Sequence, residues 1–274
     1  MAELELTILG CGSSGGVPRI GGPDGAGFWG ACDPANPKNR RRRCSVVLRR
    51  KSAAGETVVL VDTAPELKDQ LIDARVARAD AVLFTHDHAD QLHGLDDLRQ
   101  VAMLMRRRVD VWTDAVTFVG VMARFGYCFV QPQGSDYPPI LNAHTIGEPF
   151  RPFAIGGAGG DIPVLAFGQS HGRIRSLGFR FGSIAYSPDV DGLDEAAFAA
   201  LAAVDTWIVD ALRYTPHPSH SHLARTLEWI ARVKPRRAIL TNMHVDLDYA
   251  TLAAELPPGI EPAFDGMSVD AHLA

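Results

Sequence analysis

Residues 85–98 read THDHADQLHGLDDL and hold the most informative pattern in the chain. His86, His88 and Asp90 alternate, so three side chains of the metal-ligand type can converge from one short turn. The apolar residues 79–84 just before them are typical of a buried strand. A strand end that delivers two imidazoles and a carboxylate into one space suits a divalent metal. We therefore predict a metal site here rather than a solvated polar loop.

This motif closely resembles the His-x-His-x-Asp-His signature of the metallo-β-lactamase superfamily, and other segments follow in the order expected for it. They are residues 9–18 (LGCGSSGGVP), 61–67 (VDTAPEL), 170–172 (SHG), 186–189 (YSPD), 217–220 (HPSH) and 240–244 (LTNMH). The resemblance implies an α/β (α+β) fold, a four-layer αββα sandwich with a one- or two-metal site on its rim. The chain looks most like the branch of the phosphonate-pathway cyclic-phosphate phosphodiesterase, and more distantly like the tRNA 3′-processing ribonuclease.

The resemblance also implies a ligand set. His86, His88 and His171 match the histidines of the first metal, and Asp189 matches the aspartate that bridges two metals. Asp90 is expected both as a ligand of the second metal and as a catalytic residue. Imidazoles with carboxylates suit zinc or manganese, with iron as a further option.

Two positions depart from the family pattern, and both concern the second metal. Gln91 stands where the family has a histidine, so this metal binds weakly, or His93 moves in, or one metal suffices. Asn242 stands at the last ligand position, two residues before His244. Residues two apart on an extended segment point the same way, so we expect His244 rather than Asn242 as the ligand. The prediction is one tight metal site and a second, weak one.

Two further residues match positions that support the metal site in the family. His220 matches a histidine that assists the chemistry without binding metal, as a general acid or as a stabiliser of charge on the transition-state phosphate. Asp62 ends a strand near the metal turn, and we expect it to orient a ligand histidine through the free ring N–H.

Residues 38–43 (KNRRRR) form a dense basic run, which is either a solvated loop or a phosphate-binding segment. In the second case Arg41 and Arg43 reach the site and hold a phosphate bidentately. Ser14 lies in the sequence SSGG, whose backbone N–H groups could form an anion-binding nest, although a tight turn explains the pattern equally well.

Composition limits the alternatives. With 274 residues, 46% hydrophobic and 22% charged, the chain can bury a large core, and we expect one domain over residues 1–274. A net charge of −5 and a pI near 6.0 argue against a general nucleic-acid binder. No signal pattern opens the chain, and no apolar run approaches the roughly 18 residues of a membrane span. We expect a soluble, cytoplasmic protein without a membrane partner, and leave its oligomeric state open, a homodimer included.

The four cysteines are widely spaced, with no Cys-x-x-Cys pair, and should be free thiols in a reducing cytosol. The resembled branch often carries a structural zinc site of clustered cysteines in the loop after the first strand. Here that loop keeps only Cys32, so we expect buried thiols rather than a zinc site.

Strands that first meander and then alternate with helices favour two sheets flanked by helices. The expected strands are residues 4–9, 46–50, 57–62, 109–112, 163–167, 174–181, 183–186, 206–211 and 236–241. The expected helices are residues 65–74, 94–105, 114–126, 193–202, 221–233 and 247–255. Residues 131–160 are expected to be rich in loops, with room for short strands.

Three functions remain open on this evidence. The leading hypothesis is a metal-dependent phosphodiesterase that uses activated water on a small cyclic phosphate or nucleotide-like diester, and hence a small phosphorylated substrate. The second is a hydrolase of the same fold for lactones, thioesters or β-lactams. The third is a non-catalytic protein whose weakened site senses a metal or a phosphorylated ligand.

Overall fold

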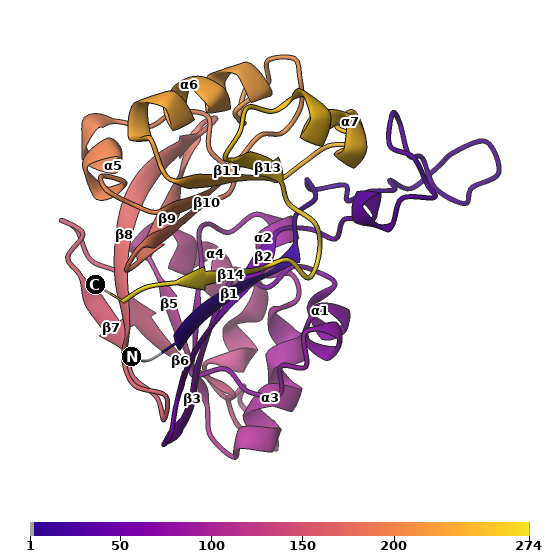
Figure 1. The fold of residues 1–274 in the computed structure, drawn as a ribbon. Helices are drawn as coiled ribbons and strands as arrows, with labels where there is room; N and C mark the ends of the chain where they lie inside the picture. Colours follow the sequence, from indigo (N-terminus) through magenta and orange to yellow (C-terminus); the bar gives the residue numbers. More distant parts are fainter. Residues whose placement is uncertain (1–2, 274) are drawn as a thin grey trace.

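Two seven-stranded sheets pack face to face in the computed structural model, which describes residues 3–273. The strand order is β14-β1-β2-β3-β4-β5-β6 in the first sheet and β13-β12-β11-β10-β9-β8-β7 in the second. Helices cover the outer face of each sheet (Figure 1). This arrangement confirms the predicted four-layer αββα class.

The first sheet begins with an antiparallel meander and continues with parallel strands. Its strands are β1 (Glu3–Gly10), β2 (Ser45–Ser52), β3 (Gly55–Val61), β4 (Ala81–Leu83), β5 (Val109–Thr113), β6 (Leu141–Thr145) and β14 (Ser268–Ala271). The helical segments of this half are η1 (Pro37–Asn39), α1 (Leu67–Asp73), α2 (Ala89–Leu92), η2 (Leu95–Asp97), α3 (Leu98–Met105), α4 (Ala115–Phe125) and η3 (Gly126–Cys128).

The second sheet repeats this plan with a hairpin followed by parallel strands. Its strands are β7 (Phe153–Ile155), β8 (Ile162–His171), β9 (Ile174–Phe181), β10 (Ile184–Ser187), β11 (Thr206–Asp210), β12 (Arg237–Thr241) and β13 (Ile260–Pro262). The helices of this half are α5 (Glu195–Ala200), α6 (Leu223–Val233) and α7 (Tyr249–Glu255).

Strand β2 explains why the interior strands are apolar on both faces. Successive side chains of a strand point to opposite faces of the sheet. Val46 and Leu48 therefore pack between the two sheets, whereas Val47 packs outward against a second cluster that includes Leu67 of α1 and Leu98 of α3. The inner cluster takes residues from both sheets, so the two sheets share one core.

The observed elements match most of the expected ranges, with two differences that bear on function. Strand β8 runs on to His171 because residues 165–171 pair with β9 throughout, so this histidine ends a strand of the second sheet. The short strands β13 and β14 were not expected, since three or four residues carry little periodicity. Strand β13 pairs with β12 and β14 with β1, at the ends of the two sheets.

The carboxyl ends of several strands meet at one edge of the sandwich. Strands β3, β4, β8, β10, β11 and β12 end there. A polar residue closes or directly follows five of them, whereas β4 is followed by Phe84 and then Thr85. The segment between β1 and β2 runs out from the body beside this edge (Figure 1). Between residues 3 and 273, no helix has the length and apolar character needed to cross a membrane.

Candidate metal centre

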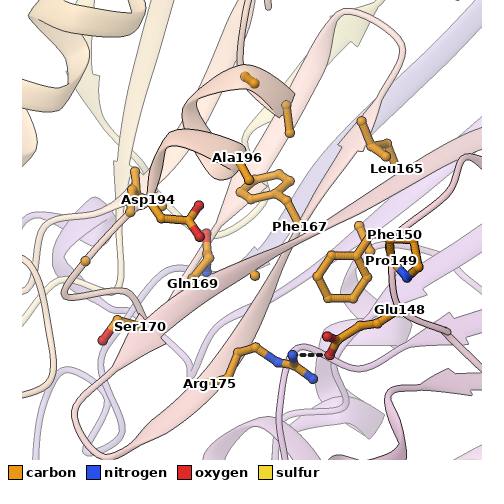
Figure 2. A pocket seen from close by; sticks show the side chains of 16 residues that line it. Glu148, Pro149, Phe150, Leu165, Phe167, Gln169, Ser170, Arg175, Asp194 and Ala196 are labelled. Carbon is orange, nitrogen blue, oxygen red and sulfur yellow. Dashed lines mark hydrogen bonds and ion pairs between the residues drawn. The ribbon is translucent and has the colours of Figure 1, made fainter.

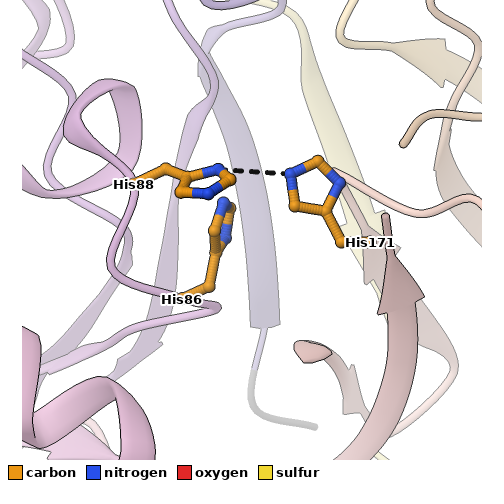
Figure 3. A group of neighbouring side chains, drawn as sticks. All are labelled: His86, His88 and His171. Carbon is orange, nitrogen blue, oxygen red and sulfur yellow. Dashed lines mark hydrogen bonds between the residues drawn. The ribbon is translucent and has the colours of Figure 1, made fainter. Parts of the chain in front are cut away.

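Three histidines converge at this edge from both halves of the sandwich (Figure 3). His86 follows β4, His88 directly precedes α2, and His171 ends β8. Each offers a ring nitrogen, and these three nitrogens lie within 4.8 Å of one another. Nε2 of His171 is 3.2 Å from Nδ1 of His88. Three imidazoles with their nitrogens at this spacing are a donor set for a transition metal.

The orientation of His86 is set from behind by Thr85. The Thr85 hydroxyl oxygen lies 2.9 Å from Nδ1 of His86, and the same hydroxyl donates to Asp62 at 2.9 Å. The sequence predicted that Asp62 contacts a ligand histidine directly; the structure corrects this, because Thr85 lies between them. Nε2 of His86 is buried and has no hydrogen-bond partner within residues 3–273. A lone pair left buried in this way fits a metal ligand.

His171 is oriented in a similar way. Its Nδ1 lies 2.6 Å from the carbonyl oxygen of Ser219, so the ring donates there and turns the lone pair of Nε2 toward His88. Burial, and then the nearby His220, lower the pKa of His171 to about 4. Burial together with the neighbouring histidines holds the pKa of His86 well below its usual value. Both rings are therefore neutral at pH 7, as metal ligation requires.

His220 has the opposite charge state. Its Nδ1 lies 2.9 Å from a carboxylate oxygen of Asp210, which ends β11, and 3.8 Å from Asp189. Burial alone would lower the pKa of His220, but the hydrogen bond and charge of Asp210, with Asp189 and Asp90, raise it to about 9. The structure thus places a protonated imidazole beside the histidine cluster, with ring centroids 4.6 Å apart for His171 and His220.

Asp189 lies deep in the site, and two side-chain amides occupy its oxygens. Nε2 of Gln91 donates to one oxygen at 3.0 Å, and Nδ2 of Asn242 donates to the other at 3.3 Å. Gln91 also donates to Asp90 at 3.3 Å. A cation bound between Asp90 and Asp189 would have to displace these hydrogen bonds. The donor set of a second metal fits less well here than the donor set of the first.

One sequence prediction about this second position is wrong, and the structure decides against one of the alternatives left open for it. The segment after β12 is not extended, because Asn242 adopts φ +60°, so Asn242 faces Asp189 while His244 lies 3.1 Å from Asp246. His93 does not replace Gln91: Gln91 is buried and reaches Asp189, whereas His93 packs edge-on against Phe125.

The basic run is also placed differently from the phosphate-binding prediction. Arg41 is buried, and its guanidinium donates to the carbonyl oxygens of Leu247 at 2.7 Å and His244 at 3.3 Å. Its Nη1 also lies 3.8 Å from Sγ of Cys32, so the guanidinium ties the loop after β1 to the segment after β12. Arg43 pairs with Glu66 at 2.9 Å. Neither arginine presents a free guanidinium to the metal centre.

Ser14 lies in a tight turn closed by Gly16 N donating to the Ser13 carbonyl at 2.7 Å, the simpler of the two alternatives. The four cysteines, all within the described residues, are free and buried, as the sequence predicted.

Sequence reasoning missed Thr85, Asp210 and Ser219. Asp210 carried a usable signal, because it ends the apolar run 206–210 (TWIVD) just as Asp62 follows the run of β3. Ser219 contributes only its backbone carbonyl oxygen, which every residue has, so the sequence holds no signal for it.

Three residues of the site hold uncommon backbone conformations. Asp62, Asp189 and Asn242 have φ of 63°, 22° and 60°. Side chains other than glycine rarely adopt positive φ, and such residues cluster where the surrounding structure imposes a functional geometry. All three lie just after the end of a strand, so the turn of the backbone aims each polar side chain into the site.

Comparison with known proteins agrees with this geometry. The family model described as "Beta-lactamase superfamily domain" matches residues 57–243. A solved structure described as a new diphosphatase from the PhnP family is 29% identical, covers 100% of this chain and 99% of its own, and superposes with a TM-score of 0.84. PqqB from Methylobacterium extorquens is 16% identical (97% of this chain, 100% of its own, TM-score 0.74), and human tRNase Z, short form, is 16% identical (97% and 98%, TM-score 0.63). These two show the fold alone.

One relative is named for an acyl-transfer activity rather than a phosphatase activity. A protein of Porphyromonas gingivalis (strain ATCC BAA-308 / W83) called octanoyltransferase is 28% identical over 269 residues, which is 96% of this chain. The match covers 51% of that protein, so this chain spans about half the length of the relative.

Proposed function

This chain belongs to the beta-lactamase superfamily, and we propose that it is a metal-dependent hydrolase that acts on a small phosphodiester. The observation that carries the proposal is the position of His220, which Asp210 holds through Nδ1 at 2.9 Å, directly beside a three-imidazole metal set. His220 supplies positive charge and a proton beside the cluster of His86, His88 and His171. The diphosphatase that is 29% identical over the full chain supports phosphoryl chemistry.

His86, His88 and His171 would hold the metal, with Asp189 as the nearest buried carboxylate. When bound, a divalent ion supplies Lewis-acid activation of water and of the phosphoryl oxygens. The donor set suits zinc or manganese, with iron as a further option, and we propose one tight site. The amides on Asp189 support this stoichiometry because a second ion would have to compete with a hydrogen bond at each oxygen of that carboxylate.

His220 is the residue that we assign to proton transfer. Asp210 accepts from Nδ1 and fixes the ring, while Nε2 has no hydrogen-bond partner among residues 3–273. A protonated Nε2 can donate to a phosphoryl oxygen or to the leaving oxygen, and the proton then passes from the ring to the departing alcohol. The buried Asp210 holds the imidazolium in place and stabilises its charge.

The proposal is tested by comparing phosphoryl and acyl substrates on one preparation. The chain, stripped with a chelator and reloaded with manganese or zinc, is assayed with bis(p-nitrophenyl) phosphate, a p-nitrophenyl ester and a lactone. We expect the phosphodiester to be preferred. His88→Ala should abolish turnover. His93→Ala should not, because this histidine packs against Phe125 and is not part of the three-histidine cluster. Preference for the ester or the lactone would contradict the proposal.

An acyl substrate is the second candidate, and a specific cavity favours it. A cavity of about 930 Å³ lies beside β8 and α5 and reaches Ser170, the neighbour of His171 (Figure 2). Phe150, Phe167 and Leu193 give it an apolar lining. The relative named octanoyltransferase adds weight, although the named activity belongs to a protein about twice as long. Faster hydrolysis of p-nitrophenyl octanoate than of both p-nitrophenyl acetate and bis(p-nitrophenyl) phosphate would favour this candidate.

A further inference from the structure

The ring of His88 is held differently from the rings of the other two histidines of the candidate metal site. Nδ1 of His86 faces the hydroxyl of Thr85, and Nδ1 of His171 faces the carbonyl oxygen of Ser219. Among residues 3–273, the ring of His88 has a hydrogen bond only with His171, at 3.2 Å. The His88 side chain is also exposed, so packing does not enclose it. The position of its ring nitrogen therefore depends on the backbone of the turn that carries it.

Asp87 lies between the two histidines, and the rest of the chain holds the turn through this residue. No backbone–backbone hydrogen bond within the described part of the chain involves Asp87. Instead, the guanidinium of Arg124 on α4 donates both to the carbonyl oxygen of Asp87 and to its carboxylate, the latter at 3.0 Å. A guanidinium is a rigid planar fork that can serve two acceptors at once. Arg124 thus fixes the main chain and the side chain of Asp87 together.

Gly120 lies one helical turn before Arg124 and leaves the space that the Asp87 side chain occupies. A Cβ added at Gly120 would lie 2.0 Å from Oδ2, 2.7 Å from Cγ and 2.9 Å from Cβ of Asp87. The contact with Cβ matters most, because that atom cannot move away unless the backbone of Asp87 moves. Glycine inside a helix costs stability relative to alanine, and Gly120 has no positive φ that would require it. The close approach of Asp87 gives a physical reason for glycine at this position.

Helix α4 is itself held in place at both halves of the sandwich. Val121 on this helix is fully buried in the outer cluster of the first sheet. At the start of the helix, the carboxylate of Asp114 accepts from Nη2 of Arg175 at 2.7 Å. Arg175 lies on β9, in the hairpin whose first strand ends at His171. The same helix therefore contacts the turn of residues 86–88 and the hairpin that carries the third histidine.

We propose that Gly120 and Arg124 are positioning residues which, through Asp87, place the ring nitrogen of His88 and so determine how tightly the first metal is held. The pair of Arg124 and Asp87 is 41% and 31% exposed, and exposed ion pairs contribute little to global stability. Contacts outside the ligand set nevertheless change metal affinity by about 10- to 100-fold when they orient a ligand. This inference rests on the metal-dependent function proposed above.

Gly120→Ala tests the close approach of Asp87. Cobalt(II), whose visible absorption depends on its coordination geometry, is titrated into the metal-free chain in competition with a chelator. The variant should bind cobalt about 10- to 100-fold more weakly and alter its spectrum, because the new Cβ displaces Asp87. Gly126→Ala is the matched control. Gly126 is also helical (φ −55°, ψ −30°), but its Cβ would meet only the side chain of Met122 at 3.6 Å. That variant should leave affinity and spectrum unchanged.

Arg124→Gln tests the fork on Asp87, and we expect a loss of cobalt affinity in the same range of about 10- to 100-fold. Arg124→Lys keeps the charge but lacks the planar fork, so it should recover only part of the affinity. Arg237→Gln is the control. It removes a comparably exposed ion pair, with Glu261 at 2.6 Å, at the opposite end of β12 from Asn242, and should not change cobalt binding.

The Tm of the metal-free chain separates positioning from general destabilisation. Arg124→Gln should have the same Tm as Arg237→Gln, although only the first loses metal affinity. If Gly120→Ala does not fold, Arg124→Gln decides the question. Unchanged affinity and spectrum in either folded variant, or losses of equal size in the two controls, would overturn the inference alone. An unmodified chain that binds no cobalt would contradict the proposed function, and the inference would fail with it.

Discussion

The hydroxyl oxygen of Thr85 lies 2.9 Å from Nδ1 of His86 and joins this ring to the buried carboxylate of Asp62. The hydroxyl can donate to Asp62 while it accepts the N–H of His86, and this fixes the tautomer that leaves Nε2 free. Thr85 and Asp62 therefore fix the orientation of the His86 ring, although neither residue contacts the metal position itself. Such outer contacts affect metal affinity because they orient the ligand and raise its basicity.

Thr85→Val should weaken metal binding without removing a ligand. The variant keeps the shape of the side chain but loses the hydrogen bond to His86, so we expect metal affinity to fall about 10- to 100-fold. Metal content after dialysis against a graded series of chelators measures this. Thr63→Val is the matched control, because that buried hydroxyl donates to the Leu92 carbonyl instead. Equal metal affinity of Thr85→Val and the unmodified chain would show that Thr85 has only a packing role.

Gln91→His should create a second tight metal site. Gln91 now donates to Asp90 and Asp189, whereas an imidazole at this position would offer a lone pair to a cation between the two carboxylates. We expect about one metal per unmodified chain and about two per variant chain after dialysis against a mild chelator. Two metals held by the unmodified chain would contradict the weak-site prediction.

His220→Gln should slow catalysis by a factor that depends on the leaving group of the substrate. If His220 protonates the leaving oxygen, kcat should fall about 10²- to 10⁴-fold for a poorly leaving alkyl alcohol. The loss should be much smaller for p-nitrophenol, which leaves without a proton. Metal content should be unchanged, since the first metal relies on other side chains. A loss of the same size for both leaving groups would assign His220 to stabilising phosphoryl charge rather than to proton donation.

Asp248 should contribute stability that disappears in acid. Burial alone would raise the pKa of Asp248, but hydrogen bonds from the backbone N–H groups of Thr251 and Asp33 and from the side chain of Asn39 lower it to about 2. Because the folded pKa is below the unfolded value of about 3.9, the contribution is full above about pH 4 and is lost as the pH falls toward 2.

Asp248→Asn should therefore lower the free energy of unfolding at pH 7 by about 1 kcal/mol, after allowance for solvent screening. Urea unfolding at pH 7, 4 and 3 should show the difference shrinking as the pH falls. Asp69→Asn, at an exposed carboxylate 3.8 Å from Lys68, is the control and should have almost no effect. A difference that stays constant over this pH range would argue against the carboxylate charge as its origin.

The sequence alone determined the fold and brought two histidines of the candidate metal site together. His86 and His88 are two residues apart after a buried strand, so local geometry brings them together whatever the rest of the chain does. His171 could be proposed because the family resemblance supplied its place, and in the structure its ring nitrogen lies within 4.8 Å of theirs. The apolar runs 46–50 and 57–62 were sufficient to predict the strands β2 and β3.

Tertiary structure decided everything that depends on side chains meeting from different strand ends. The direction of Asn242 follows from one positive φ, which no propensity predicts, and that single torsion turns His244 away toward Asp246. Arg41 lies in a basic run that was expected to face solvent or a substrate phosphate. Its guanidinium is instead buried, where it donates to the carbonyl oxygen of Leu247, 206 residues away in the sequence. Such pairings depend on long-range packing, so only the folded chain specifies which cations of the basic run serve the structure.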